Sequence, residues 1–158
     1  MQMIRIVVEV ETPVHISDVT RRLMEAFGVT RAGSRITTAV EQAVRLGVRH
    51  NLFNGRGGFI YSADSRPVPI RSRAHWDTPE RKFEWVAPEE LDEALVETVT
   101  LGFSMSYEDA ISGALSLLGF GRATAKIAGV VEERISNLSA QGRLRMANGL
   151  VTVASSAL

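Results

Sequence analysis

Residues 16–44, ISDVTRRLMEAFGVTRAGSRITTAVEQAV, align without a gap with residues 107–135, YEDAISGALSLLGFGRATAKIAGVVEERI, at an offset of 91 positions. Seven of the 29 aligned pairs are identical, and most of the others exchange one apolar residue for another. A repeat of this length is typical of one supersecondary unit that a chain uses twice. The sequence therefore predicts two homologous structural units. It also indicates that any function belongs to the repeated unit rather than to a single active site.

Each copy is predicted to open with a helix. In the second copy, PEELDEALVETVTLG begins with proline and acidic residues and carries Leu91, Leu95 and Val99 at helical spacing. In the first copy, residues 3–10 are rich in β-branched side chains and also fit a strand. Because the matching segment of the second copy has clear helical signals, we predict a helix at this place in both copies.

The middle of each copy predicts a helix, a tight turn and another helix. PVHI and FSMS are expected to be short extended segments before the second helix. That helix should end at Gly28 and at Gly119, because glycine adopts the left-handed conformation that stops a helix. We expect the third helix over residues 31–47 and 122–139.

Each copy closes with a predicted β-hairpin. NLFNGRGGFIYS and RLRMANGLVTVA both place two β-prone runs around a glycine-containing tip, and Asn-Gly is a strong hairpin signal. Helix, short strand, helix, turn, helix and hairpin is the order of a winged helix. The predicted fold is α+β and mainly helical, with tandem duplicated winged-helix units at residues 1–63 and 87–158. Residues 64–86 are the predicted linker.

The end of this linker, KFEWV, alternates like a strand that could extend a wing or bridge the two units. Phe83 and Trp85 within it are expected to pack against one unit rather than to stack on bases.

Several function classes are excluded by composition. The chain has no cysteine, which rules out disulfides and cysteine-rich zinc sites. The apolar run near the N-terminus is too short for a signal peptide or a membrane span, so we expect a cytoplasmic protein with no membrane partner. His15, His50 and His75 lie in three separate segments without metal-ligand spacing. We therefore predict no enzyme activity, no metal or cofactor and no small-molecule substrate.

Adjacent carboxylates are also unsuited to catalysis. Neighbouring helical residues point about 100° apart, so such pairs are predicted to form a solvated face. The pairs are Glu89/Glu90, Asp92/Glu93 and Glu132/Glu133.

The charges are unevenly distributed although the formal net charge is +0. Residues 1–83 hold 13 Lys and Arg against 8 Asp and Glu, whereas residues 84–158 hold 5 against 10. Halves of opposite sign suggest a division of labour or mutual attraction.

The third helix of the first copy has one apolar and one polar side. A helical projection places these residues against the core: Ala32, Ile36, Ala39, Val40, Ala43 and Gly47. The other side and the wing tip carry side chains able to contact bases and phosphates. They are Arg31, Ser34, Arg35, Thr38, Gln42, Arg45, Arg49 and Arg56, with Glu41 among them. The pattern predicts that the first copy binds DNA, or RNA, through this helix and the wing.

The third helix of the second copy is unsuited to a phosphate backbone. Its outward residues are Arg122, Ala125, Lys126, Gly129, Glu132, Glu133 and Ser136. The carboxylates of Glu132 and Glu133 are predicted to form a protein contact instead. A protein-docking module that makes no nucleic-acid contact is therefore the alternative for the whole chain.

Several blocks in order resemble a known domain. They are VEVETPVHISDVTRRLMEAFGVTRAGSRI, GGFIYS, VPIRSRA, APEELDEALVETV and LLGFGRATAKI. Through them the chain resembles an uncharacterised domain of unknown function at the C-terminus of large bacterial superfamily 1 helicases, which often carry a segment similar to very-short-patch-repair endonucleases. The resemblance implies an accessory module whose partner is a helicase/nuclease polypeptide or a neighbouring domain. The chain has no phosphate-binding GxxxxGK loop, so the ATPase motor itself is absent.

Overall fold

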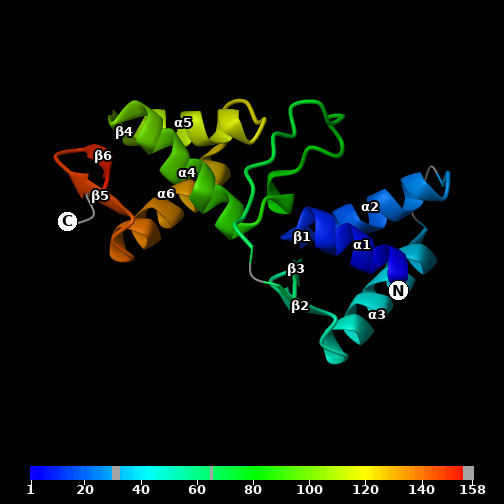
Figure 1. Cartoon of the computed structure of the whole chain (residues 1–158). Helices are drawn as coiled ribbons and strands as arrows, with labels where there is room; N and C mark the ends of the chain where they lie inside the picture. Colours follow the sequence, from blue (N-terminus) through cyan, green and yellow to red (C-terminus); the bar gives the residue numbers. More distant parts are fainter. Residues whose placement is uncertain (30–32, 65, 155–158) are drawn as a thin grey trace. The chain divides into compact units, whose positions relative to one another are not determined.

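The structure is a computed structural model that describes residues 1–29, 33–64 and 66–154 (Figure 1). The chain divides into two compact units. Unit 1 comprises Met1–Val68 and Glu84–Ala87, and unit 2 comprises Pro69–Phe83 and Pro88–Leu158.

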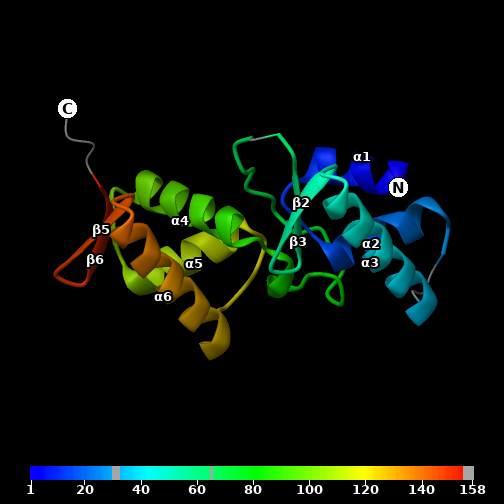
Figure 2. The same ribbon diagram turned by 90° about the horizontal axis from the view of Figure 1, so that it is seen from below.

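Unit 1 contains three helices and a small antiparallel sheet, best followed in Figure 2. The elements are α1 (Gln2–Glu11), β1 (Val14–His15), α2 (Ile16–Ala26), α3 (Ser34–Arg49), β2 (Phe53–Arg56) and β3 (Phe59–Ser62). The strand order is β1-β3-β2, and Val14 lies opposite Ile60. Ile4, Val8, Val19 and Val40 are among the buried side chains of the core.

Unit 2 repeats this plan. Its elements are α4 (Pro88–Gly102), β4 (Ser104–Ser106), α5 (Tyr107–Leu117), α6 (Ala125–Ala140), β5 (Leu144–Ala147) and β6 (Leu150–Val153). The strand order is β4-β6-β5, and Met105 lies opposite Val151. Leu95, Leu115 and Ile135 are fully buried in the core.

The two units match at a constant offset of 91 residues well beyond the aligned segment. α2 and α5, α3 and α6, β2 and β5, and β3 and β6 all begin and end 91 positions apart. The strand register follows the same offset, since the Val14–Ile60 pair recurs as Met105–Val151. The predicted fold, α+β with two helix-plus-wing units, is confirmed.

Backbone conformation at the turns confirms the predicted ends of the second helices and the predicted hairpin tips. Gly28 and Gly119, which follow α2 and α5, have φ values of 65° and 81°. At the hairpin tips, both central residues have positive φ in each unit, the pattern of a type I′ turn. They are Gly57 and Gly58 in unit 1, and Asn148 and Gly149 in unit 2.

The third helices begin later than predicted. α3 starts at Ser34 and α6 at Ala125, not at residues 31 and 122. In unit 2 the reason is an N-cap, because the Thr124 hydroxyl accepts a hydrogen bond from the Ile127 N–H at 3.3 Å. The predicted positions Arg31 and Ala32 lie outside the described residues.

The predicted core side of α3 is also partly wrong. Ala39 is exposed, whereas Val44, which the projection left out, is buried with Val40 and Gly47. The β-branched Val44 buries more apolar surface than an alanine, so the helix turns this side inward.

The KFEWV segment does not form a strand. Phe83–Trp85 is a 3-10 helix, η1, and no strand pairs with it among the residues that the structure describes. Both rings are packed, but within different units and not against one: Phe83 lies edge-on to Phe120 in unit 2 with centroids 5.7 Å apart, and Trp85 stacks on His15 in unit 1 at 6.0 Å. The alternation of apolar residues therefore reflects ring packing and not strand pairing.

Two carboxylates predicted to be solvated are buried in unit 2. Glu90 is fully buried, and its carboxylate accepts hydrogen bonds from Arg73 at 2.8 and 2.9 Å and from Arg71 at 3.0 Å. Asp92 is also buried and pairs with Arg134. Burial alone would raise the pKa of Glu90, but the hydrogen bonds and charges of Arg73 and Arg71 outweigh it and hold the pKa below its ordinary value. The arginines that pair with Glu90 precede α4 by many residues, so the helical pattern around Glu90 could not indicate them.

Candidate nucleic-acid interface

The predicted contact residues of the first copy are all on the surface where the structure describes them. Six lie on α3 or at its start and one on the β2–β3 hairpin: Ser34, Arg35, Thr38, Gln42, Arg45, Arg49 and Arg56. Exposure follows from the helix pattern, because Val40, Val44 and Gly47 occupy the opposite side of α3.

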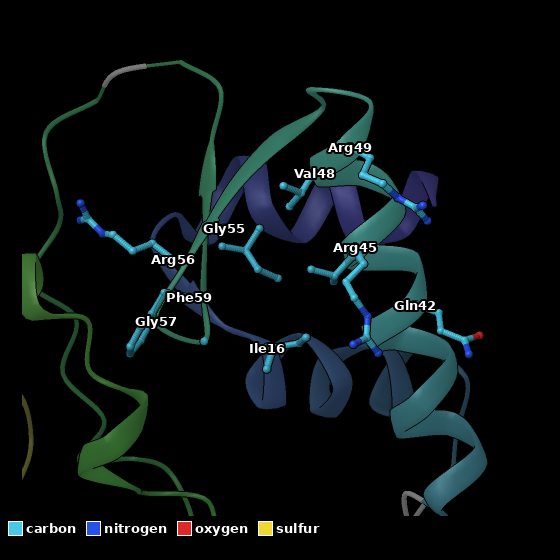
Figure 3. A pocket seen from close by; sticks show the side chains of 12 residues that line it. Ile16, Gln42, Arg45, Val48, Arg49, Gly55, Arg56, Gly57 and Phe59 are labelled. Carbon is cyan, nitrogen blue, oxygen red and sulfur yellow. The ribbon is translucent and has the colours of Figure 1, made fainter.

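A cleft of about 700 Å³ lies between the C-terminal half of α3 and the β2–β3 hairpin (Figure 3). Four of the predicted residues line it, namely Gln42, Arg45, Arg49 and Arg56, and no lining residue is acidic. Ser34, Arg35 and Thr38 are not among the lining residues. The structure thus brings the C-terminal half of the predicted set to one feature and leaves the N-terminal part of α3 outside it.

The inner surface of the cleft is apolar. Its remaining lining residues are Ile16, Val44, Val48, Gly55, Gly57, Gly58, Phe59 and Ile60. Sequence reasoning missed this surface because its apolar residues come from α2, α3 and both hairpin strands. The available signal was the glycine-rich tip, since residues without side chains leave room beside a helix.

Figure 3 shows how the side chains lie around the opening. Val48 points into the space between α3 and the hairpin, and the Arg45 side chain runs along α3 at the edge of this space. Gln42 and Arg49 project along the outer side of α3, and Arg56 projects from the hairpin away from α3. The cleft therefore has an apolar interior and a cationic rim.

Two of the rim arginines have partners. Arg45 lies 3.4 Å from Glu41 in an exposed ion pair, and the Arg56 guanidinium lies 5.2 Å from the centre of the Tyr61 ring. Arg35 and Arg49 make no ion pair with any residue in the described ranges. Exposed pairs contribute little, so Arg45 can exchange Glu41 for another anion at small cost.

The same positions in unit 2 carry different chemistry. At the offset of 91, Gln42, Arg45, Arg49 and Arg56 correspond to Glu133, Ser136, Ala140 and Ala147. Glu132 and Glu133 are both exposed on α6. Two arginines of unit 2 are engaged in ion pairs: Arg134 pairs with Asp92, and Arg143 lies 3.0 Å from Glu93. Unit 2 therefore carries small neutral side chains where unit 1 carries the cleft arginines, and its α6 has Glu133 in place of Gln42.

The cleft region of unit 2 is also shaped differently. Met146 stands where unit 1 has Gly55, and Tyr107 stands where unit 1 has Ile16. The Tyr107 hydroxyl donates a hydrogen bond to the Met146 sulfur at 2.6 Å. Side chains in unit 2 thus meet across the place that stays open in unit 1.

Within residues 1–29, 33–64 and 66–154, no group of three or more histidine or acidic side chains is arranged to hold a metal ion. The helices of the same ranges include none that is long and apolar enough to cross a membrane.

Comparison with known proteins gives one partial match. Residues 1–38 match the family described as "Protein of unknown function (DUF3320)". This segment covers α1, β1, α2 and the start of α3. No curated protein and no solved structure was found to match the chain.

Proposed function

We propose that this protein is a non-catalytic accessory module that binds DNA through α3 and the β2–β3 hairpin of unit 1. The observation that supports it best is that Arg45, Arg49 and Arg56 all line the cleft and that no lining residue is acidic. In winged helices the third helix and the wing are the elements that contact nucleic acid.

The chemistry of binding is mainly electrostatic. Arg35 and Arg49 have no ion-pair partner among the described residues, so a phosphate would compete only with water for them. Arginine offers two parallel N–H donors to phosphate, which fixes position as well as adding affinity. Each phosphate neutralised releases counterions, so affinity should fall steeply as salt rises.

Unit 2 has a different role in this proposal. Glu132 and Glu133 would repel phosphates, and they suit a contact with a basic protein surface. The resemblance to the C-terminal domain of large helicases supports a helicase/nuclease polypeptide as the partner, and a cytoplasmic location goes with it.

A docking module without nucleic-acid contact is the second candidate. Exposed apolar side chains around the C-terminal end of α4 favour it, because Leu101 is 66% and Phe103 is 85% exposed. Exposed apolar groups of this size often belong to protein interfaces. Phe103 has a φ of 63°, a conformation that is uncommon for a residue with a side chain.

Titration of a fluorescent DNA duplex at about 50 and 200 mM salt tests the proposal. The informative variant gives unit 1 the residues of unit 2: Arg45→Ser, Arg49→Ala and Arg56→Ala. We expect the slope of log affinity against log salt to fall by about three, one for each phosphate contact removed. The matched control carries Arg122→Ala and Arg145→Ala in unit 2, and it should bind like the wild type. Absence of binding at the lower salt would refute DNA binding and favour docking.

A further inference from the structure

We propose that the cleft of unit 1 binds a single unpaired nucleotide, with its base on the apolar interior and its phosphate at the rim arginines. The inference rests on the proposed function and narrows its substrate to DNA that offers an unpaired base, at an end, a junction or a single-stranded stretch.

The cleft is open because of particular small residues. Gly55 faces Val48 so closely that a Cβ atom there would lie 3.2 Å from the Val48 Cγ2 atom. Unit 2 has Met146 at the matching position, in contact with Tyr107. The glycine at position 55 therefore leaves room in unit 1 at a place where unit 2 has the Met146 side chain.

The interior suits the face of a base better than the surface of a duplex. Bases inside a duplex present only their edges to the grooves, while their flat faces are stacked on neighbouring bases. An unpaired base exposes those faces and can be buried on a protein surface. The half-buried side chains of Ile16 and Val48 offer apolar contact inside the cleft, and a volume of about 700 Å³ falls within the usual range for small-ligand sites.

The charges at the rim favour a nucleotide over an uncharged apolar group. Arg45 lies on α3 at the edge of the opening, and Arg49 follows it one turn later on the same helix. Glu41 is a carboxylate next to this rim, and it already lies against Arg45. An apolar ligand that carries a phosphate satisfies both the interior and the rim. An acidic protein segment with an apolar side chain is the competing occupant, and the experiment below separates the two.

The test compares three DNA probes with the same duplex sequence. One has blunt ends, one has a short single-stranded overhang, and one has an overhang of equal length made of abasic nucleotides. The abasic overhang keeps the phosphates and the flexibility and lacks only the bases. We expect the normal overhang to bind about tenfold more tightly than the abasic one, because removing a base loses its contact with the interior.

A cleft-filling variant locates the site. Gly55→Met with Ile16→Tyr copies the contact of unit 2 and leaves every rim arginine in place. It should bind the normal and the abasic overhang equally, and it should bind the blunt duplex within about twofold of the wild type. Met146→Gly in unit 2 is the matched control and should keep the wild-type preference. Thermal unfolding of each variant checks that unit 1 is folded, and the abasic comparison with the wild-type protein stands even if the variant is not.

The possible results separate the two proposals. Equal binding of all three probes by the wild type overturns the unpaired-nucleotide site and leaves DNA binding in place. A folded variant that still prefers the normal overhang also overturns it, because the base would then lie elsewhere. If no probe binds at all, both proposals fail, and the cleft is left to an acidic protein segment.

Discussion

Unit 1 exposes Arg45, Arg49 and Arg56 at the positions where unit 2 carries Ser136, Ala140 and Ala147. The backbone elements that hold these residues begin and end at the same offset. One scaffold therefore presents a cationic surface in one copy and a neutral to acidic surface in the other. The difference teaches that a winged-helix topology does not by itself fix the charge of the surface at the third helix and the wing, because that charge depends on a few side chains.

The two units also differ in the side chains that they bury. Unit 2 buries the Glu90 carboxylate between Arg71 and Arg73, which belong to the segment before α4. Unit 1 pairs a buried glycine, Gly47, with the large ring of Phe53, whereas unit 2 has two leucines, Leu138 and Leu144, at the matching positions. The tryptophans give separate probes for the two units, since Trp85 belongs to unit 1 and Trp76 to unit 2.

The largest effect is expected for Glu90→Ala. Removal of the carboxylate leaves the buried guanidinium of Arg73 without its main partner, which should destabilise unit 2 by about 3–5 kcal/mol. Denaturant unfolding followed by Trp76 fluorescence measures the loss, while Trp85 should report an unchanged unit 1. Glu97→Ala, at an exposed position of the same helix, is the control and should stay within about 0.5 kcal/mol of the wild type. An equally small effect at Glu90 would contradict the assignment of a buried ion-pair cluster.

The next largest effect is expected when the Gly47–Phe53 pair of unit 1 is replaced by the pair of leucines found in unit 2. A Cβ atom on Gly47 would lie 2.2 Å from the Phe53 ring, so Gly47→Leu should destabilise unit 1 by about 3 kcal/mol. Adding Phe53→Leu reproduces the pair of leucines in unit 2 and should recover most of this loss. The double-mutant cycle, followed through Trp85, tests whether the two units use interchangeable packing. Additive losses in the double variant would show that they do not.

Replacing the glycines that follow α2 and α5 should destabilise the protein by different amounts. Gly28 and Gly119 both have positive φ, so alanine at either position should cost about 1 kcal/mol through backbone strain. At Gly119 the new Cβ atom would also lie 2.2 Å from the Ala74 nitrogen, whereas at Gly28 nothing lies within 4 Å. We expect Gly119→Ala to cost about 1–3 kcal/mol more than Gly28→Ala in thermal or denaturant unfolding. Equal costs would mean that the segment at residues 73–74 does not pack tightly on the end of α5.

Acid should weaken unit 2 through the same cluster, by less than the Glu90→Ala change. Because the pKa of Glu90 is lowered in the folded state, its stabilising contribution is complete above the unfolded value of about 4.3. It is lost progressively as the pH falls from there through the folded pKa. Unfolding measured through Trp76 between about pH 5 and 3 should show this loss, and Glu90→Gln should flatten the pH dependence. An unchanged slope in the variant would assign the acid sensitivity to other groups.

The sequence alone was sufficient for the topology. The repeat, the glycines that end α2 and α5, and the Asn-Gly hairpin tip are local signals, and each acts through the φ angles or the helical period of a few residues. The outward side of α3 could likewise be found from a helical projection, because Arg35, Gln42 and Arg49 recur at intervals of seven residues.

Only the tertiary structure determined which polar groups are buried, how the segment KFEWV packs and where the cleft lies. Glu90 looked like a surface carboxylate until Arg71 and Arg73 were placed on it, since burial of a charge depends on partners distant in the sequence. Phe83 and Trp85 alternate as a strand would, yet each ring packs on a residue far along the chain. The cleft likewise exists only where α2, α3 and the hairpin meet around Gly55, a meeting that no local pattern contains.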